Sequence, residues 1–124
     1  MKYSNLVTAS KRKNRKKLFQ SHSNQRRKIM SSLLSKSLKE KYKIKSLPIR
    51  KDDEVKITRG LMKGKVGKIV QCHRKNFSIY IDKITRIKTG KSMSYLPISP
   101  SNVIIIGLSI TNERKTLFVK KKLA

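Results

Sequence analysis

Residues 52–70 of the chain read DDEVKITRGLMKGKVGKIV, which combines a strand, a basic turn rich in glycine and a second strand. Val55 and Ile57 alternate with polar neighbours, and this two-residue period is typical of a half-buried strand. Glycine lets the backbone turn through positive φ and lets a bulky partner approach closely. We therefore expect three structural glycines in this turn, namely Gly60, Gly64 and Gly67.

The charge of the chain indicates the kind of partner. Its 124 residues include 33 Lys and Arg but only 6 Asp and Glu, which gives a net charge of +27. A compact chain with this charge repels itself and cannot balance the charge internally. A polyanion is therefore the expected partner, with nucleic acid as the first candidate and an anionic membrane surface as the second.

Other features exclude further classes of protein. Cys72 is the only cysteine, so no disulfide forms within the chain, which suits a reducing compartment. No apolar run approaches the roughly 18 residues of a membrane span. Residues 1–10 also lack the apolar core of a signal peptide. We expect a cytosolic or nuclear chain without membrane insertion.

Charge and glycine content divide the chain into segments. Residues 1–51 hold 17 of the 33 Lys and Arg together with one acid, Glu40, and contain no glycine. The hydrophobic content of 36% predicts a small core, so we expect RNA or a larger assembly to add stability. The predicted segments are a basic RNA-threading extension at 1–24, a helix and linker at 25–51, a small mainly-β barrel at 52–110 and a basic tail at 111–124.

The secondary structure follows from periodicity and breakers. The basic run at 11–17 predicts that residues 1–24 are disordered or only weakly helical. Apolar residues at three- and four-residue steps predict a helix over 25–43, and Pro48 starts an extended linker over 47–51. A last basic helix is expected over 112–122. The expected strands are 54–58, 66–72, 77–82, 84–87 and 103–106, with turns at 74–76 and 89–92.

Little in the sequence supports catalysis or metal binding. Cys72 and His73 are adjacent, but together with His22 they supply at most three ligands without the paired spacing of a zinc site. Cys72 is expected to be a strand residue, and His73 is expected to lie near a turn within reach of phosphate. Acidic residues are too few for a typical acid–base site. We expect no enzyme, no metal, no cofactor and no small-molecule substrate.

The acidic run at 52–54 is expected to be structural. Asp53 and Glu54 would cap the entry of a strand or pair with the neighbouring Arg50 and Lys51, and a metal-binding carboxylate cluster at 52–54 is the alternative. The glycine turn is also not an NTPase phosphate loop, because Lys65 is followed by Val66 where such a loop needs Ser or Thr to bind magnesium.

The glycine-rich segment resembles a KOW motif, with Gly67 in the key glycine position of that motif after apolar Val66. Its flanks closely resemble the eukaryotic branch of a KOW-containing large-subunit ribosomal protein family, numbered twenty-four in bacteria and twenty-six in eukaryotes. The resemblance covers roughly residues 2–119. It is carried by the stretches 26–32, 34–36, 48–55, 80–85, 100–105 and 112–115.

This resemblance implies an SH3-like barrel with a basic N-terminal extension. It also implies binding to the 5′ region of large-subunit ribosomal RNA, beside neighbouring ribosomal proteins and near the polypeptide exit tunnel. The corresponding location is the cytoplasmic ribosome, with assembly in the nucleolus. Leu33 stands where the family pattern has proline, so the helix over 25–43 is expected to run unbroken. The alternative is a KOW module of a transcription elongation factor or of another RNA-binding regulator.

The predicted RNA contacts are basic side chains rather than aromatic ones. Aromatic residues are too sparse for a single-strand stacking platform, so we expect recognition of the backbone and shape of folded RNA. Arginine can hold a phosphate with two parallel bonds, whereas lysine acts as a mobile point charge. The candidates are Lys11, Arg12, Lys13, Arg15, Lys16, Lys17, Arg26, Arg27, Lys28, Arg50, Lys51, Arg59, Lys63, Lys65, Lys68, Arg74 and Lys75.

Overall fold

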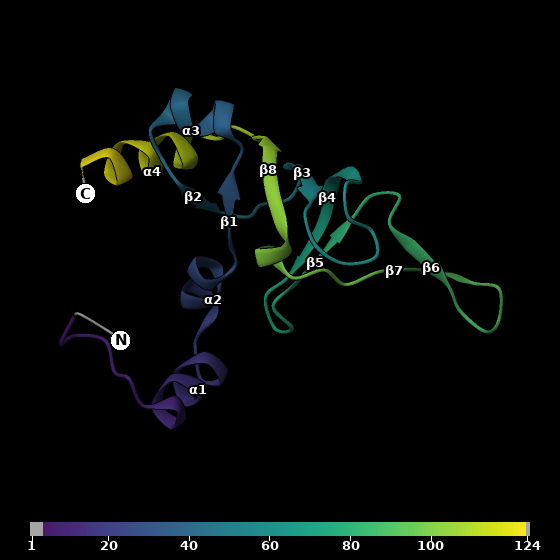
Figure 1. Cartoon of the computed structure of the whole chain (residues 1–124), viewed down its shortest axis with the longest axis horizontal. Helices are drawn as coiled ribbons and strands as arrows, with labels where there is room; N and C mark the ends of the chain where they lie inside the picture. Colours follow the sequence, from purple (N-terminus) through teal and green to yellow (C-terminus); the bar gives the residue numbers. More distant parts are fainter. Residues whose placement is uncertain (1–3, 124) are drawn as a thin grey trace.

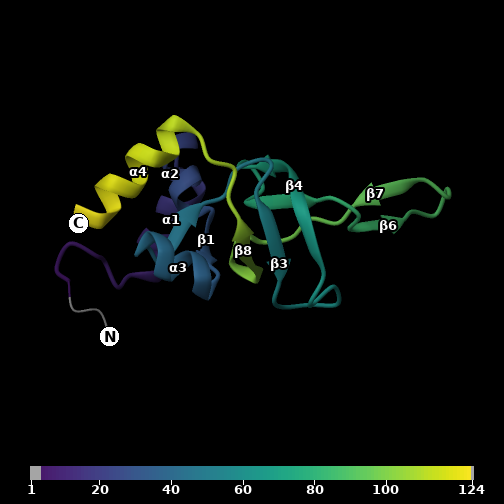
Figure 2. The same ribbon diagram turned by 90° about the horizontal axis from the view of Figure 1, so that it is seen from above.

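The computed structural model describes residues 4–123. The first three residues of the predicted segment 1–24 and the last residue of the predicted segment 111–124 therefore lie outside the described residues. Helices gather at one end of the molecule, the barrel lies in the middle and a β-hairpin projects from the other end (Figure 1 and Figure 2). The helices are α1 (Lys11–Phe19), α2 (Ser23–Ile29), α3 (Lys36–Tyr42), the 3₁₀ turn η1 (Pro100–Asn102) and α4 (Asn112–Leu123). The strands are β1 (Ser31–Leu34), β2 (Ser46–Pro48), β3 (Glu54–Ile57), β4 (Val66–His73), β5 (Ser78–Ile81), β6 (Thr85–Ile87), β7 (Met93–Tyr95) and β8 (Val103–Gly107).

Six of these strands form one mixed sheet in the order β2-β1-β8-β3-β4-β5, and β6 pairs with β7 in a separate hairpin. β8 runs antiparallel to β3 and parallel to β1. The pairing register shifts between Glu54 and Val55 and again between Ile69 and Gln71. Such irregularities bend a strand, and a bridge between Ile79 and Ile98 helps the bent sheet to curl into a small barrel. The predicted barrel is confirmed.

Most of the core consists of aliphatic side chains from the strands, and Met30, Ile84 and Phe118 are among its members from outside the strands. In β3 the burial alternates between exposed and buried, with Val55 and Ile57 fully inside. This is the period-2 pattern that the sequence predicts. The other fully buried aliphatic residues are Leu34, Leu47, Ile69, Ile79, Ile81, Ile84, Val103 and Ile105.

The predicted strands and turns over 54–106 are present, with strand ends that differ by at most one residue, whereas β7 is not among the predicted strands. The turn at 74–76 joins β4 to β5, and the turn at 89–92 closes the hairpin with a bond from Lys88 N to Ser92 O of 2.9 Å. The predicted helix over 112–122 is also present as α4, and Phe118 on it is buried against the Tyr42 ring at 4.8 Å between centroids.

The prediction of one helix over 25–43 is wrong. The chain is helical at α2 and α3, but the segment between them is the strand β1. β1 finds two partners, β2 in antiparallel and β8 in parallel orientation, and its Leu34 is buried in the core. Tertiary pairing overrides the helical period here, and the strand interrupts the helix even though Leu33 replaces the proline of the family pattern. The expected linker over 47–51 likewise begins within β2.

Gly67 is required by packing rather than by a turn. A Cβ atom built on it would lie 2.7 Å from Ile81 Cγ2 and 2.9 Å from the carbonyl oxygen of Asp82. β4 and the end of β5 approach closely at this point, where Asp82 N donates to Lys68 O at 2.8 Å. Gly60 and Gly64 differ, since they lie in open space with φ of +95° and +88°, a conformation that suits glycine.

Candidate nucleic-acid interface

The β3–β4 turn presents a compact basic surface. Its backbone is fixed by bonds from Gly64 N to Ile57 O at 2.8 Å and from Lys63 N to Gly60 O at 3.1 Å. Because the glycines carry no side chains, the basic side chains dominate what a partner meets. Four predicted contact residues are exposed on this turn and on the first part of β4, namely Arg59, Lys63, Lys65 and Lys68.

Helix α1 is a second basic surface. It buries none of its residues and has no acid in its first turn. Arg15 lies over the ring of Phe19 at 4.9 Å, a contact that leaves the guanidinium edge open to solvent. The predicted contact residues on α1 are all exposed and are Lys11, Arg12, Lys13, Arg15, Lys16 and Lys17.

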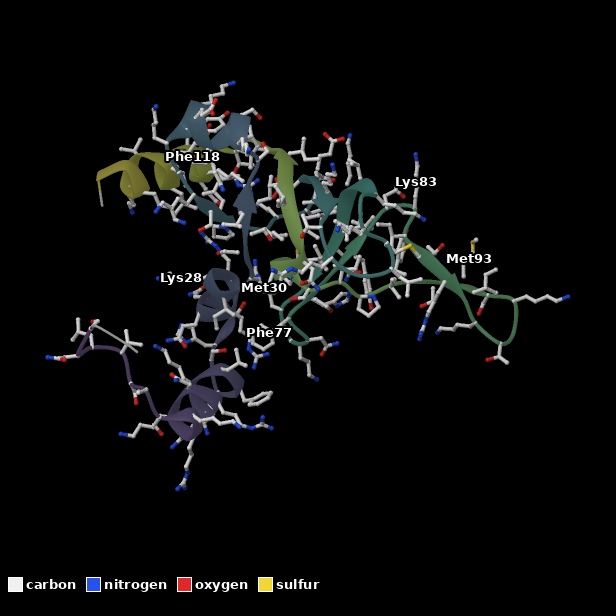
Figure 3. All side chains as sticks on the ribbon, in the orientation of Figure 1. Lys28, Met30, Phe77, Lys83, Met93 and Phe118 are labelled. Carbon is white, nitrogen blue, oxygen red and sulfur yellow. The ribbon has the colours of Figure 1, made fainter. Side chains whose placement is uncertain are left out.

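The side chain of Arg26 holds three segments of the molecule together, and we call its hydrogen bonds to Ser21, Phe19 and Lys75 the Arg26 clasp. Its Nε donates to Ser21 O at 2.8 Å, its Nη2 to Phe19 O at 3.0 Å and its Nη1 to Lys75 O at 3.2 Å. Its guanidinium also lies 5.2 Å from the centre of the Phe77 ring, which sits between the barrel and the N-terminal helices (Figure 3). Arg26 therefore ties α1 and α2 to the β4–β5 turn, and fewer of its donors face outward than the sequence suggests.

The remaining predicted residues lie around the junction of α2 with the barrel. Arg74 follows β4 and donates to Ser23 Oγ at 3.2 Å. Arg50 is paired with Glu113 at 3.0 Å. Arg27 is half-buried near both, whereas Lys28 points away from the sheet (Figure 3). Lys51 and Lys75 are exposed nearby. This group and the β3–β4 turn lie at opposite ends of β4.

The acidic run at 52–54 has a partner that the sequence does not reveal. Asp53 is fully buried and binds Arg114 of α4 through both carboxylate oxygens. Asp53 also accepts from the backbone N of Arg50 at 3.0 Å, which is the strand-entry cap that we expect. The other option, a side-chain pair with Arg50, does not form, because the side chain of Arg50 binds Thr111 and Glu113.

The β6–β7 hairpin carries a further basic surface, whose residues are not among the contacts predicted from the sequence. Its basic side chains are exposed, and they stand beside apolar residues that are themselves largely exposed, Ile87 at 72% and Met93 at 74%. Figure 3 shows Met93 on the projecting hairpin and Lys83 at its base. The available signal is the density of basic residues around the Gly90 turn. The residues are Lys83, Arg86, Lys88 and Lys91.

The Cys72–His73 pair is structural. Cys72 lies in β4 as expected, and burial raises the pKa of its thiol, with Asp53 adding to the rise while Arg74 and Arg114 oppose it. The His73 ring packs edge-on against Tyr80 at 4.5 Å, and its Nε2 is buried without a hydrogen-bond partner among the described residues. His73 therefore does not reach outward to phosphate. Within residues 4–123, no three His, Cys, Asp or Glu side chains are placed to hold a metal.

No helix in the described part of the chain is long and apolar enough to cross a membrane. Each of three hollows on the described part of the chain has at least three basic residues in its lining, together with apolar and neutral polar ones.

Comparisons with known proteins agree with this arrangement. The family described as ribosomal proteins L26 of eukaryotes, together with their archaeal L24 counterparts, matches residues 8–122. The chain is 46% identical over 122 residues to the large ribosomal subunit protein uL24 of Littorina littorea, covering 98% of this chain and 85% of that one. It is 46% identical over 121 residues to uL24 of Dictyostelium discoideum, covering 98% and 87%. It is 45% identical over 121 residues to uL24 of Schizosaccharomyces pombe, covering 98% and 96%.

Proposed function

We infer the function from one premise, namely that the chain belongs to the family of eukaryotic ribosomal proteins L26 and their archaeal L24 counterparts and is a eukaryotic-type large-subunit ribosomal protein. Its role is that of a structural constituent in translation. We propose that it binds large-subunit ribosomal RNA and supports assembly of the subunit near the polypeptide exit tunnel. Membership of this family sets aside the alternative of a transcription elongation factor.

Helix α1 is the observation that carries the proposal of RNA binding. A helix with dense like charge and no buried residue gains nothing from packing on its own chain. Its charges repel one another, and phosphates that lie between them remove this cost and release counterions. We propose that residues 1–24 thread along RNA, that 25–51 join this extension to the barrel at 52–110, and that 111–124 form a basic tail.

Three surfaces share the proposed contacts. They are α1, the junction of α2 with the barrel, and the β3–β4 turn, which lie on separate elements (Figure 1). A protein with such spaced surfaces can touch several RNA segments at once, which suits a role in holding folded RNA together. Neighbouring ribosomal proteins are the other proposed partners, and the ribosome of the cytoplasm, after nucleolar assembly, is the proposed location. Neither an enzyme activity nor a small-molecule substrate is part of the proposal.

The salt dependence of binding tests this proposal. Each neutralised phosphate contributes about 0.7 to 0.9 to the slope of log K against log salt concentration. Ten phosphate contacts give an expected slope of about −7 to −9. The affinity for a fragment from the 5′ region of large-subunit ribosomal RNA is measured by fluorescence anisotropy at several salt concentrations. A slope near −2, or equal affinity for an unrelated RNA of the same length, contradicts the proposal.

A further inference from the structure

Three arginines from different parts of the chain line one hollow at the junction of α2 with the barrel. Arg27 comes from α2, Arg50 from the β2–β3 connection and Arg74 from the turn after β4. The lining also includes Pro48, the buried Ile49, and Glu113 and Arg114 of α4. We name the three side chains Arg27, Arg50 and Arg74 the arginine notch.

The charges around the notch do not cancel. Four guanidinium groups line the hollow, counting Arg114, and the two carboxylates next to them belong to Glu113 and Asp53. Asp53 is committed to Arg114, with which it forms a buried pair. Glu113 binds Arg50 through a single 3.0 Å contact at the surface. A surplus of about two positive charges therefore remains, and it rests on Arg27 and Arg74.

The hydrogen-bonding groups of the notch are filled only in part, since Arg50 donates to Thr111 and Glu113 while Arg27 and Arg74 keep spare donors. Arg74 donates to Ser23 Oγ through one nitrogen. The side chain of Arg27 is half-buried, yet it has no hydrogen bond or ion pair within the described part of the chain. A guanidinium carries five N–H donors in a planar fork that matches phosphate or carboxylate oxygens. Arginines that line one hollow and keep spare donors make a site suited to one anionic group.

A second hollow continues from the first. Both hollows are lined by Ile49, Arg50 and Arg74, and the lining of the second also includes Lys51 and, on β4, Gln71. The notch is therefore one part of a longer basic groove, and a polymer with repeated phosphates fits this shape better than an isolated ion does.

We propose that the arginine notch binds one phosphate group of an RNA backbone, held by Arg27 and Arg74 and supported by Arg50. This inference rests on the proposed function and narrows it. Isolated exposed charges are screened, whereas several arginines that line one hollow hold a phosphate in one orientation and would fix how the α2–barrel junction sits on RNA.

Nuclear magnetic resonance of the arginine Nε–Hε groups in the unaltered full chain tests the proposal directly. On addition of the ribosomal RNA fragment, the signals of Arg27 and Arg74 shift together to a saturated position. If the complex forms and the Arg27 and Arg74 signals keep their positions, the proposal is overturned.

Substitutions give an independent readout. Arg27→Gln weakens binding about tenfold, since a hydrogen-bonded charge is lost, whereas Lys28→Gln on the same helix weakens it about twofold, because an exposed charge is screened. Arg27→Lys recovers only part of the loss because lysine has no fork. Unchanged thermal unfolding of the three variants excludes misfolding. Equal affinities of Arg27→Gln and Lys28→Gln overturn the notch.

Inorganic pyrophosphate separates the two sources of phosphate. We expect it to shift the Arg27 and Arg74 signals only at concentrations well above those of RNA, and RNA to displace it. Binding of pyrophosphate that RNA cannot displace overturns the RNA backbone as occupant and indicates a site for free polyphosphate. A different result would contradict the proposed function itself, namely that the unaltered chain shows no preference for ribosomal RNA over other RNA.

Discussion

Asp53 and Arg114 form a buried pair that joins the barrel entry to helix α4. Arg114 Nη2 donates to Asp53 Oδ2 at 2.6 Å, and Nη1 donates to Oδ1. Asp53 also accepts from the backbone N of Ser109 at 3.0 Å, and Arg114 donates to Pro48 O at 3.0 Å. Every charge in this network has partners, so the pair orders three chain segments that lie far apart in sequence.

Breaking this pair on one side should be costly. Arg114→Met leaves the buried Asp53 carboxylate without its counter-charge, and we expect the free energy of unfolding to fall by about 3–5 kcal/mol. Glu113→Gln is the matched control on the same helix, because its pair with Arg50 is exposed and is worth less than about 1 kcal/mol. Urea unfolding followed by circular dichroism measures both. Similar losses for the two variants would show that Arg114 is not the anchor of α4.

Gly67 should tolerate no side chain. Gly67→Ala forces a methyl group against Ile81 Cγ2 and the Asp82 carbonyl, and we expect a loss of about 1–3 kcal/mol because backbone must move. Gly90→Ala is the control, since nothing lies within 4 Å of its added Cβ and its φ is not positive. We expect that variant to stay within about 0.5 kcal/mol of the parent. A Gly67→Ala protein as stable as Gly90→Ala would contradict the close approach of β4 and β5.

Removing the Arg26 clasp should loosen the N-terminal helices and leave the barrel folded. Arg26→Gln loses donors to Ser21, Phe19 and Lys75, so amide protection of α1 and α2 should fall while that of β3 and β4 is kept. Hydrogen exchange with mass spectrometry measures both regions. Lys28→Gln, on the exposed side of α2, is expected to leave protection unchanged. Loss of protection throughout the barrel would instead make Arg26 part of the global fold.

Charge removal on α1 should reduce RNA binding without changing stability. Replacing Lys11, Lys13 and Lys16 by Gln removes about three phosphate contacts, which lowers the steepness of the salt slope by about 2 to 3. The melting temperature should hold, because α1 buries no residue. The control replaces Lys36, Lys41 and Lys45, which lie outside the predicted contacts, and should leave the slope nearly unchanged. Equal changes for the two triple variants would mean that only net charge matters.

The thiol of Cys72 should make stability depend on alkaline pH. Burial raises the pKa of Cys72 above its ordinary value of 9.0, so the folded state retains the proton longer than the unfolded state does. The thiol therefore contributes stability that is fully present below pH 9 and is lost as pH rises through the folded pKa. Comparing urea unfolding of the parent and of Cys72→Ser between pH 8 and pH 10 (about the range of free thiol titration) measures the difference. A parent curve parallel to that of Cys72→Ser would contradict the shift.

The parts of the fold that the sequence predicts are those set by local pattern. The alternation of Val55 and Ile57 with polar residues predicts β3. Glycine and polar residues predict the turns. β1 does not, because Ser31–Leu34 has no alternating pattern and becomes a strand by pairing with Ile104 and Ile105 far along the chain. Leu34 fits the three- and four-residue period of a helix, but a strand in the same place also buries it. Periodicity alone therefore cannot tell whether this segment is a helix or a strand.

The candidate interface is predictable in its charge and less so in the role of each residue. Net charge and clustering identify α1 and the β3–β4 turn, whose basic side chains are all exposed. They cannot distinguish Arg26, which donates to carbonyl groups inside the molecule, from Arg27 beside it, which does not. That difference depends on the path of α2 against the β4–β5 turn, and no local pattern encodes it.

The parallel pairing of β1 with β8 has a consequence for the order in which the protein is made. Leu33 and Leu34 pair with Ile104 and Ile105, so the strand nearest the N-terminus waits for one of the last elements to be synthesised. Until then β1 has only β2 as a pairing partner, and its contact with β8, of such long sequence separation, forms slowly. We therefore expect β1 and β2 to join the barrel sheet late in folding, after β8 has been synthesised.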